Sequence, residues 1–185
     1  MRTIVVPLCS LLALSAGAIA FADGFTLESA SFGSNATLGT TLIYNDNGCN
    51  GGNTSPELHW SGAPPDTKSF AVTLFDPDAR NGAGFWHWLV FDINAKTTSL
   101  EPGAGAAAGS NTPPGSVSAK NEFGDIGYSG PCPPRGNKPH RYVFTVYALR
   151  TEHLGLANGA DPAAVKKALE DNTLLSTSLQ GQYGR

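Results

Sequence analysis

Residues 133–149 read PPRGNKPHRYVFTVYAL. After the prolines and glycine of its first half, the segment from Arg141 to Leu149 is rich in Val, Phe and Tyr, which favour β-strands. In a strand every second side chain points to the same face, so His140 and Tyr142 share a face with Phe144 and Val146. The stretch therefore predicts a strand whose first residues carry polar groups in line with its core-facing side chains.

Two further segments have the same character. They are residues 69–75 (SFAVTLF) and 85–93 (FWHWLVFDI). Alternation places Asp76 on the face of the apolar side chains of the first segment, Phe70, Val72 and Leu74. It places His87 on a face of the second segment, with Phe85, Leu89, Phe91 and Ile93. If the three strand ends converge, they form a shallow pocket with two imidazoles, a phenol and one or two carboxylates.

The rest of the chain predicts weaker elements. Strand candidates cover residues 25–32, 38–44, 58–60 and 174–179. One helix has clear start signals, with Asp161 as the N-cap, Pro162 at the first position and the helix running over 163–169. Residues 101–118 are rich in Gly, Ala and Pro and predict a surface loop. Dominant strands with one late helix indicate a mainly β protein of antiparallel sheets packed as a sandwich.

Composition limits the class of protein and of partner. The chain has 185 residues, 41% hydrophobic and 15% charged, which suits one globular domain over residues 23–185. Its formal net charge is −3 and it has no long run of Lys or Arg. These features argue against nucleic acid or an anionic membrane as an electrostatic partner.

The first 22 residues resemble a secretory signal peptide. Arg2 supplies a positive start, an apolar stretch follows over residues 4–19, and small-x-small sites end at Ala20 and Ala22. We expect cleavage after Ala22 and a periplasmic or secreted mature protein. The alternative is an uncleaved anchor, although the apolar run is short for a membrane span. No later segment predicts a transmembrane helix.

Cleavage would remove Cys9 and leave Cys49 and Cys132. An even pair in an exported protein predicts a disulfide. The bridge would close a long loop and stabilise the fold by roughly 4 kcal/mol. The alternative is two separate free thiols.

Each polar residue also has a purely structural interpretation. A histidine on an apolar face is more often a hydrogen-bonded core residue than a ligand. The segment from Asp76 to Asp78 could simply form a turn. Trp86 and Trp88 flank His87, and at least one of them is expected to pack in the core. The repetition of the pattern on three strands favours a binding site.

Several motifs together resemble the phosphatidylethanolamine-binding protein family. They are residues 76–79 (DPDA), 86–88 (WHW), 133–142 (PPRGNKPHRY) and 54–60 (TSPELHW). The resemblance extends from about Phe25 to the C-terminus. Within the family the chain resembles the bacterial YbhB/YbcL branch, also described as Raf kinase inhibitor-like, and its cysteine contexts resemble the exported type, which supports the disulfide.

The resemblance implies a β-sandwich with a pocket for phosphate or phosphorylated head groups at one edge. The implied pocket residues are Asp76, His87, Gly130, Pro133, His140 and Tyr142. Imidazole N–H groups, the tyrosine O–H and backbone N–H groups would donate to anionic oxygens. Asp78 would support the loop. Arg80 stands where the family pattern has a second proline, which removes a fixed φ and adds a charge at the pocket rim.

The functional prediction is an exported ligand-binding or regulatory protein, more a binder than an enzyme, without a cofactor or metal. The prediction includes modulation of a partner protein, whose identity the residues do not give. One alternative is a hydrolase using Asp76, His87 and His140, although no Gly-x-Ser-x-Gly elbow is present. Others are a kinase or protease inhibitor-like protein, and a zinc site built from the same histidines and aspartate.

Overall fold

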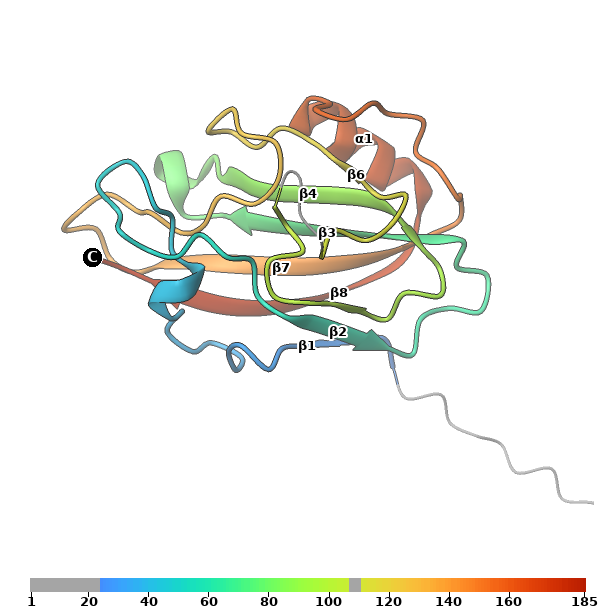
Figure 1. Cartoon of the computed structure of the whole chain (residues 1–185), viewed down its shortest axis with the longest axis horizontal. Helices are drawn as coiled ribbons and strands as arrows, with labels where there is room; N and C mark the ends of the chain where they lie inside the picture. Colours follow the sequence, from blue (N-terminus) through green and yellow to red (C-terminus); the bar gives the residue numbers. More distant parts are fainter. Residues whose placement is uncertain (1–23, 107–110) are drawn as a thin grey trace, which may run out of the picture.

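The computed structural model describes residues 24–106 and 111–185 (Figure 1). The expected signal peptide lies outside the described residues, as does Cys9. Within the described part of the chain, no helix is long and apolar enough to cross a membrane.

A five-stranded antiparallel sheet organises the molecule, and three of its strands are those predicted most clearly from the sequence. Its strand order is β6-β4-β3-β7-β8. The bounds are β6 Val117–Ser118, β4 Phe85–Asn94, β3 Ser69–Asp76, β7 His140–Leu149 and β8 Thr173–Tyr183. The last strand is longer than expected because it pairs with β7 along almost its whole length, from Thr173 to Tyr183.

A smaller antiparallel sheet lies beside one face of the large one, which confirms the predicted mainly β sandwich. It has the order β1-β2-β5, with β1 Thr26–Glu28, β2 Leu58–Ser61 and β5 Ser99–Leu100. The main core contains side chains from both sheets, including Leu58, Trp60, Val72 and Phe144. Because burial of such apolar side chains dominates folding stability, this layer fixes how the sheets face each other.

One α-helix, α1 (Pro162–Asn172), covers the other face of the large sheet. The predicted N-cap is confirmed, because the Asp161 side chain accepts the Ala163 N–H at 2.8 Å. Val165 and Leu169 of α1 form a second buried cluster with Leu89 and Phe91 of β4. The large sheet is therefore apolar on both faces.

The strand expected over residues 38–44 is wrong. The segment holds a short 3-10 helix, η1 (Thr40–Leu42), and irregular chain on either side. The Leu38 N–H donates to the Gln182 carbonyl of β8, but the rest of the segment pairs with a neighbouring loop: the Gly51 N–H donates to the Tyr44 carbonyl and the Asn53 N–H to the Ile43 carbonyl. The apolar side chains that suggested a strand are buried, although their backbone forms no β-ladder. The loop expected over 101–118 contains β6 at its end.

The prediction that His87, Leu89, Phe91 and Ile93 share one face of β4 is also wrong, because two irregularities in β4 shift the alternation of its side chains. Leu74 pairs with Trp88 but Phe75 pairs with Trp86, which leaves His87 as an extra residue. A second shift surrounds Asp92, whose φ is +57°. Such bulges rotate the following side chains. Leu89 and Phe91 consequently face α1, whereas Trp88 packs in the core between the sheets.

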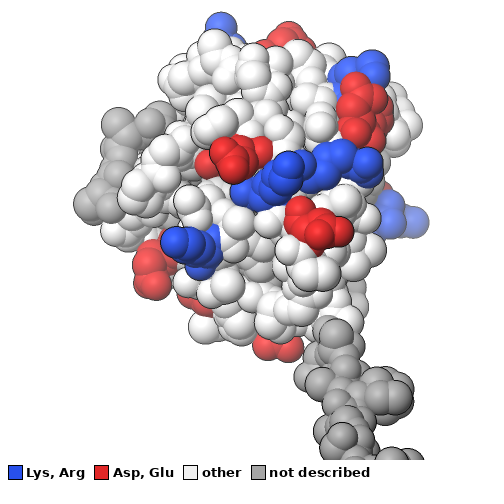
Figure 2. Space-filling model, turned by 90° about the vertical axis from the view of Figure 1, so that its right-hand side faces the viewer, with Lys and Arg blue, Asp and Glu red and all other residues white. Residues whose placement is uncertain are grey.

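Charged side chains are mixed on the side of the molecule that lies at the right of Figure 1. There, basic residues lie between acidic ones and form no separate basic surface (Figure 2). The opposite edge, at the left of Figure 1, is where the polar strand ends meet.

Candidate functional site

The polar strand ends predicted from the sequence meet in one cavity. Asp76 ends β3, His87 lies near the start of β4 and His140 begins β7. Since these strands are antiparallel neighbours, the end of one lies beside the starts of the other two. The cavity has a volume of about 390 Å³ and opens to solvent. It is lined by Asp76, Asp78, Ala79, Arg80, Asn81, Phe85, His87, Phe123, Cys132, Pro133, Pro134, Asn137, His140 and Tyr142.

Asp76 and His140 form a buried pair. The His140 Nδ1 lies 2.8 Å from the Asp76 Oδ2, and the two side chains are only 8% and 3% exposed. The other carboxylate oxygen accepts the N–H groups of Asp78 and Ala79, at 2.9 and 3.1 Å. With a proton on Nδ1, the His140 Nε2 is left to face Asn137, whose amide nitrogen lies 3.4 Å away. Asp76 therefore fixes both the loop that follows β3 and the orientation of the imidazole.

His87 is held as a neutral ring. Its Nδ1 lies 2.8 Å from the Ser129 carbonyl oxygen and so donates to it. The rings of Phe85, Phe123 and Tyr142 surround it at centroid distances of 4.9, 5.5 and 5.4 Å. Burial lowers the pKa of His87 to about 4, because the apolar surroundings disfavour the charged form. In this tautomer the Nε2 carries a lone pair and acts as an acceptor.

Tyr142 brings a polar group with no partner to the cavity. Its side chain is fully buried, and its hydroxyl has no hydrogen-bond partner among the described residues. Burial raises the pKa of the phenol, and the nearby Asp76 carboxylate raises it further through its charge and a weak side-chain contact, although no hydrogen bond of good geometry joins the two groups. The hydroxyl therefore stays protonated and is available as a donor. A buried polar group without a partner is costly, so this hydroxyl marks a place where a ligand group or water belongs.

Two ion pairs border the cavity. Asp78 accepts from the Arg141 guanidinium at 2.7 Å and from the Arg141 backbone N–H at 2.8 Å. These hydrogen bonds lower the pKa of Asp78 to about 2. Arg80 pairs with Glu122, and its guanidinium carbon lies 4.7 Å from the centre of the Phe85 ring. The expected loop-supporting residues Asp78 and Arg80 thus lie at the rim with their charges already matched.

The backbone conformation of Arg80 accounts for the absence of the family proline at this position. Its φ is +51°, a left-handed conformation that the fixed ring of proline cannot adopt. Asn81 follows with a φ of +57°. The loop after β3 therefore has a conformation that excludes proline at position 80.

Gly130 does not line the cavity. Its N–H donates to the Asn53 Oδ1 at 2.8 Å, so this group does not face an anion. A Cβ at Gly130 would overlap the Leu42 carbonyl oxygen, which gives the glycine a packing role. Pro133, by contrast, lines the cavity as expected.

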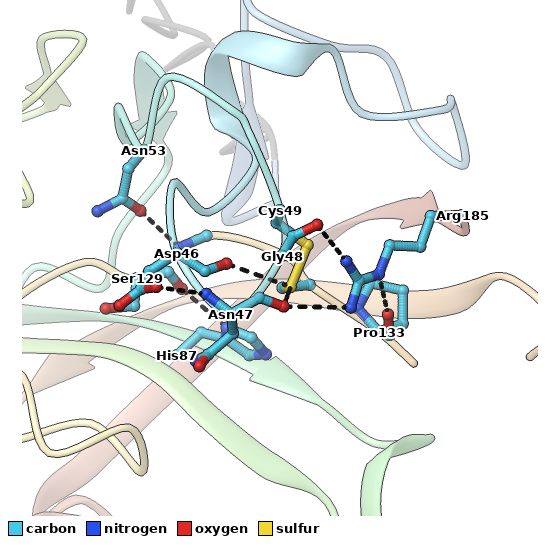
Figure 3. Close-up of a disulfide and its surroundings, with 11 residues drawn as sticks. Asp46, Asn47, Gly48, Cys49, Asn53, His87, Ser129, Pro133 and Arg185 are labelled. Atoms are coloured by element: carbon cyan, nitrogen blue, oxygen red, sulfur yellow. Dashed lines mark hydrogen bonds between the residues drawn. A yellow bond between two sulfur atoms is a disulfide. The ribbon is translucent and has the colours of Figure 1, made fainter. Parts of the chain in front are cut away.

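The Cys49–Cys132 disulfide is present and joins the cavity wall to the loop that follows η1. Cys132 lines the cavity next to Pro133. The last residue, Arg185, holds the same two loops: its Nε donates to the Pro133 carbonyl at 2.7 Å and its guanidinium to the Gly48 carbonyl at 2.6 Å (Figure 3).

Sequence reasoning missed three contributors to the site. Asn137 lies inside the quoted motif at 133–142 but was not distinguished from its neighbours. Phe123 and Arg185 carry no local signal, because only long-range packing brings them to the site. Across the described ranges, no group of three or more His, Cys, Asp or Glu side chains could hold a metal ion.

Comparison with known proteins gives a consistent result. The sequence profile described as phosphatidylethanolamine-binding protein matches residues 28–184. The UPF0098 protein YbcL of Escherichia coli is 43% identical over 162 residues, which cover 88% of each chain. Its crystal structure superposes with a TM-score of 0.85 and 42% identity, over 88% of this chain and 99% of that one. UPF0098 protein YbhB of the same organism is 40% identical over 76% of this chain and 88% of its own.

A more distant relative is the putative lipoprotein LppC of Mycobacterium tuberculosis, which is 36% identical over 73% of this chain and 62% of its own length. The profile match spans most of the described residues and includes every residue of the cavity. The chain belongs to the phosphatidylethanolamine-binding protein family.

Proposed function

We propose that this chain is an exported protein that binds a small phosphorylated anion in the cavity around Asp76, His87 and His140, and that it does not turn the ligand over. The observation that carries the proposal is the Tyr142 hydroxyl, a buried donor without a protein partner at the cavity floor. A bound oxygen would satisfy it and remove the cost of leaving it unpaired.

Other groups of the cavity suit the same ligand. The Asn137 amide supplies further donors beside His140. The Phe85 and Phe123 rings give the cavity apolar walls, a combination typical of small-molecule sites with a few oriented polar groups. The family is described by its binding of phosphatidylethanolamine, whose head group carries a phosphate.

The residues that line the cavity support binding without turnover. None of them is a serine, a threonine or a lysine, and Cys132 is in the disulfide. A hydrolase remains the second candidate because the Asp76–His140 pair resembles a base with its orienting carboxylate. Incubation with phosphoethanolamine should release no inorganic phosphate above the rate measured with His140→Ala, and faster release by the wild type would favour the hydrolase.

Export is supported by two observations. A disulfide is typical of oxidising compartments, and one relative is named a putative lipoprotein. We therefore retain residues 1–22 as a signal peptide. N-terminal sequencing of the protein recovered from the periplasm should begin at Asp23, whereas recovery in the cytoplasm with Met1 intact would contradict export.

Calorimetric titration with inorganic phosphate and with phosphoethanolamine tests the binding site. We expect saturable binding to the wild type and its loss in His140→Ala. His153→Ala is the matched control, since His153 is 73% exposed and lines a different cavity. No heat of binding with either compound would contradict the proposal.

A further inference from the structure

Ser129 is joined to His87 through both of its backbone groups. The His87 Nδ1 donates to the Ser129 carbonyl at 2.8 Å, and the Ser129 N–H donates to the His87 carbonyl at 3.0 Å. The Ser129 carbonyl therefore sets the tautomer of the ring, because a proton held on Nδ1 leaves a lone pair on Nε2. Without this acceptor the proton would be free to occupy either nitrogen, and the polar atom that His87 presents to the cavity would no longer be fixed.

Asp125 holds the Ser129 side chain from outside the cavity. The Asp125 Oδ2 accepts the Ser129 hydroxyl at 2.8 Å, and the oxygen of that hydroxyl accepts the Asn121 amide N–H, also at 2.8 Å. Ser129 is only 1% exposed, whereas Asp125 is exposed and does not line the cavity. A hydrogen bond to a charged carboxylate is stronger than one between neutral groups, so Asp125 is the strongest partner of the Ser129 side chain.

The same carboxylate oxygen also supports one wall of the cavity. The Asp125 Oδ2 accepts the Tyr44 hydroxyl at 2.8 Å, and the Tyr44 ring is stacked on the Phe123 ring with the centroids 4.6 Å apart. Phe123 lines the cavity, where its ring contacts those of Phe85 and His87. Burial raises the pKa of Tyr44 and the hydrogen bond to Asp125 raises it further, so the phenol remains a donor.

Asn121 holds the backbone of the same loop without help from the Asp125 side chain. Its Oδ1 accepts the backbone N–H groups of Phe123 and Asp125 at 3.0 and 3.1 Å, and its amide donates to the Gly127 carbonyl at 3.1 Å. Asn121 is itself buried, with 3% of its surface exposed. Loss of the Asp125 carboxylate should therefore leave the loop folded and change the orientation of the side chains that the carboxylate holds.

We propose that Asp125 is a positioning residue for the cavity. Through Ser129 it fixes the acceptor that sets the His87 tautomer, and through Tyr44 it supports the Phe123 wall. What this implies for ligand affinity rests on the proposed function, whereas the effect on the His87 tautomer is independent of any ligand.

The charge of Asp125 separates this role from a simple electrostatic effect. Removal of a negative charge near an anion site should strengthen the binding of an anion if Coulomb interactions alone act. Loss of the positioning hydrogen bonds should weaken the binding of the same anion. The two explanations therefore predict opposite signs for Asp125→Ala.

The first measurement is the His87 tautomer in the ligand-free protein. Nitrogen NMR of the histidine rings distinguishes the two neutral tautomers, and near pH 7 His87 is neutral because its pKa is lowered to about 4. The wild type should have its proton on Nδ1, and Asp125→Ala should have a mixture of both tautomers. A residue that only stabilised the fold would lower the melting temperature and leave the tautomer unchanged.

The second measurement is the affinity for phosphoethanolamine by calorimetry. Asp125→Ala should weaken binding about fivefold, the change expected for loss of one net hydrogen bond. Asp125→Asn keeps an acceptor oxygen and should lose less. Asp66→Ala is the matched control, because it removes the same charge from an exposed turn before β3, at the opposite end of that strand from the cavity.

Two variants separate the two contacts of the carboxylate. Ser129→Ala removes the contact that leads to His87 and should give the same mixture of tautomers as Asp125→Ala. Tyr44→Phe keeps the ring that stacks on Phe123 but removes its hydroxyl, so it should weaken binding and leave the tautomer unchanged. Because Asp125 acts on His87 through Ser129, addition of Asp125→Ala to Ser129→Ala should change the tautomer no further.

The possible outcomes are distinct. A single tautomer in Asp125→Ala, with unchanged or stronger binding, would overturn this inference and leave the proposed function standing, provided that His140→Ala still abolishes binding. Weaker binding with an unchanged tautomer would overturn the assignment of His87 to Asp125. If the wild type binds no phosphoethanolamine, the proposed function is refuted, and the tautomer of the ligand-free protein still decides whether Asp125 positions His87.

Discussion

Removal of the Cys49–Cys132 disulfide should lower the free energy of unfolding by about 4.5 kcal/mol. The two cysteines are separated by 83 residues, and the bridge removes the entropy of this loop from the unfolded chain. The chain-entropy relation for a loop of that length gives about 4.5 kcal/mol at 25 °C. This is a large part of the 5–15 kcal/mol that typically separates the folded and unfolded states.

The folded state should survive the loss, which makes the effect measurable. Arg185 still holds the Pro133 and Gly48 carbonyls together, so the two loops stay in place without the covalent bond. Truncation of the buried Cys49 side chain adds a small packing cost in an alanine variant. Comparison of oxidised and reduced wild-type protein avoids that cost and isolates the bond.

Urea unfolding followed by circular dichroism is the appropriate assay. With a slope of about 2 kcal/mol per molar urea, a loss of 4.5 kcal/mol moves the midpoint by about 2 M. The doubly substituted Cys49→Ala/Cys132→Ala protein should match the reduced wild type to within about 1 kcal/mol. A midpoint that shifts by less than about 0.5 M on reduction would refute the assignment of this stabilisation to loop closure.

Three further predictions concern the cavity. The pKa of His87 is lowered from 6.5 to about 4, so the unfolded chain binds more protons than the folded one between these pH values. The contribution of neutral His87 to the free energy of unfolding is fully present above pH 6.5, and the free energy should fall by about 3 kcal/mol as the pH drops towards 4. A His87→Gln variant should lose less over the same range in urea titrations. The pKa of Asp78 is lowered from 3.8 to about 2, so the stabilisation from Arg141 is present above pH 3.8 and disappears as the pH falls through 2. Because both side chains are partly exposed, Arg141→Gln should lower the stability only slightly at pH 7, and a loss that persists unchanged at pH 2 would contradict this origin. Arg80→Pro should destabilise the protein by about 2 kcal/mol or more in thermal unfolding, because proline cannot adopt a φ of +51°. Arg80→Ala removes the exposed pair with Glu122 and the contact with the Phe85 ring, and should cost less than about 1 kcal/mol; equal costs would show that the loop adapts.

The strongest sequence patterns predicted the elements that form the sheet and the site. The strands that end at Asp76 and begin at His140 keep strict alternation, so their polar ends point where period two places them. The N-cap at Asp161 was readable because the signal is local: a capping carboxylate followed by proline. The family motifs implied a pocket of six residues, and five of them, Asp76, His87, Pro133, His140 and Tyr142, line the cavity.

Three features could not be read in this way because they depend on distant partners. The segment over residues 38–44 has strand-like composition, but after Leu38 its backbone pairs mainly with loops, which no local pattern encodes. The extra residue at His87 shifts the alternation of β4, and its cause lies in the pairing with β3. Gly130 was expected to donate to a ligand, yet Asn53 takes its N–H from a segment 77 residues earlier.

We infer that the Tyr142 hydroxyl binds a ligand and does not stabilise the fold. Its most direct test is thermal unfolding of Tyr142→Phe with and without phosphoethanolamine, beside Tyr147→Phe, a control on the same strand that packs towards α1. We predict that Tyr142→Phe without ligand is at least as stable as the wild type, because a buried unpaired hydroxyl is removed, and that most of the stabilisation by ligand is lost. Lower stability without ligand, together with an unchanged ligand-induced shift, would contradict it.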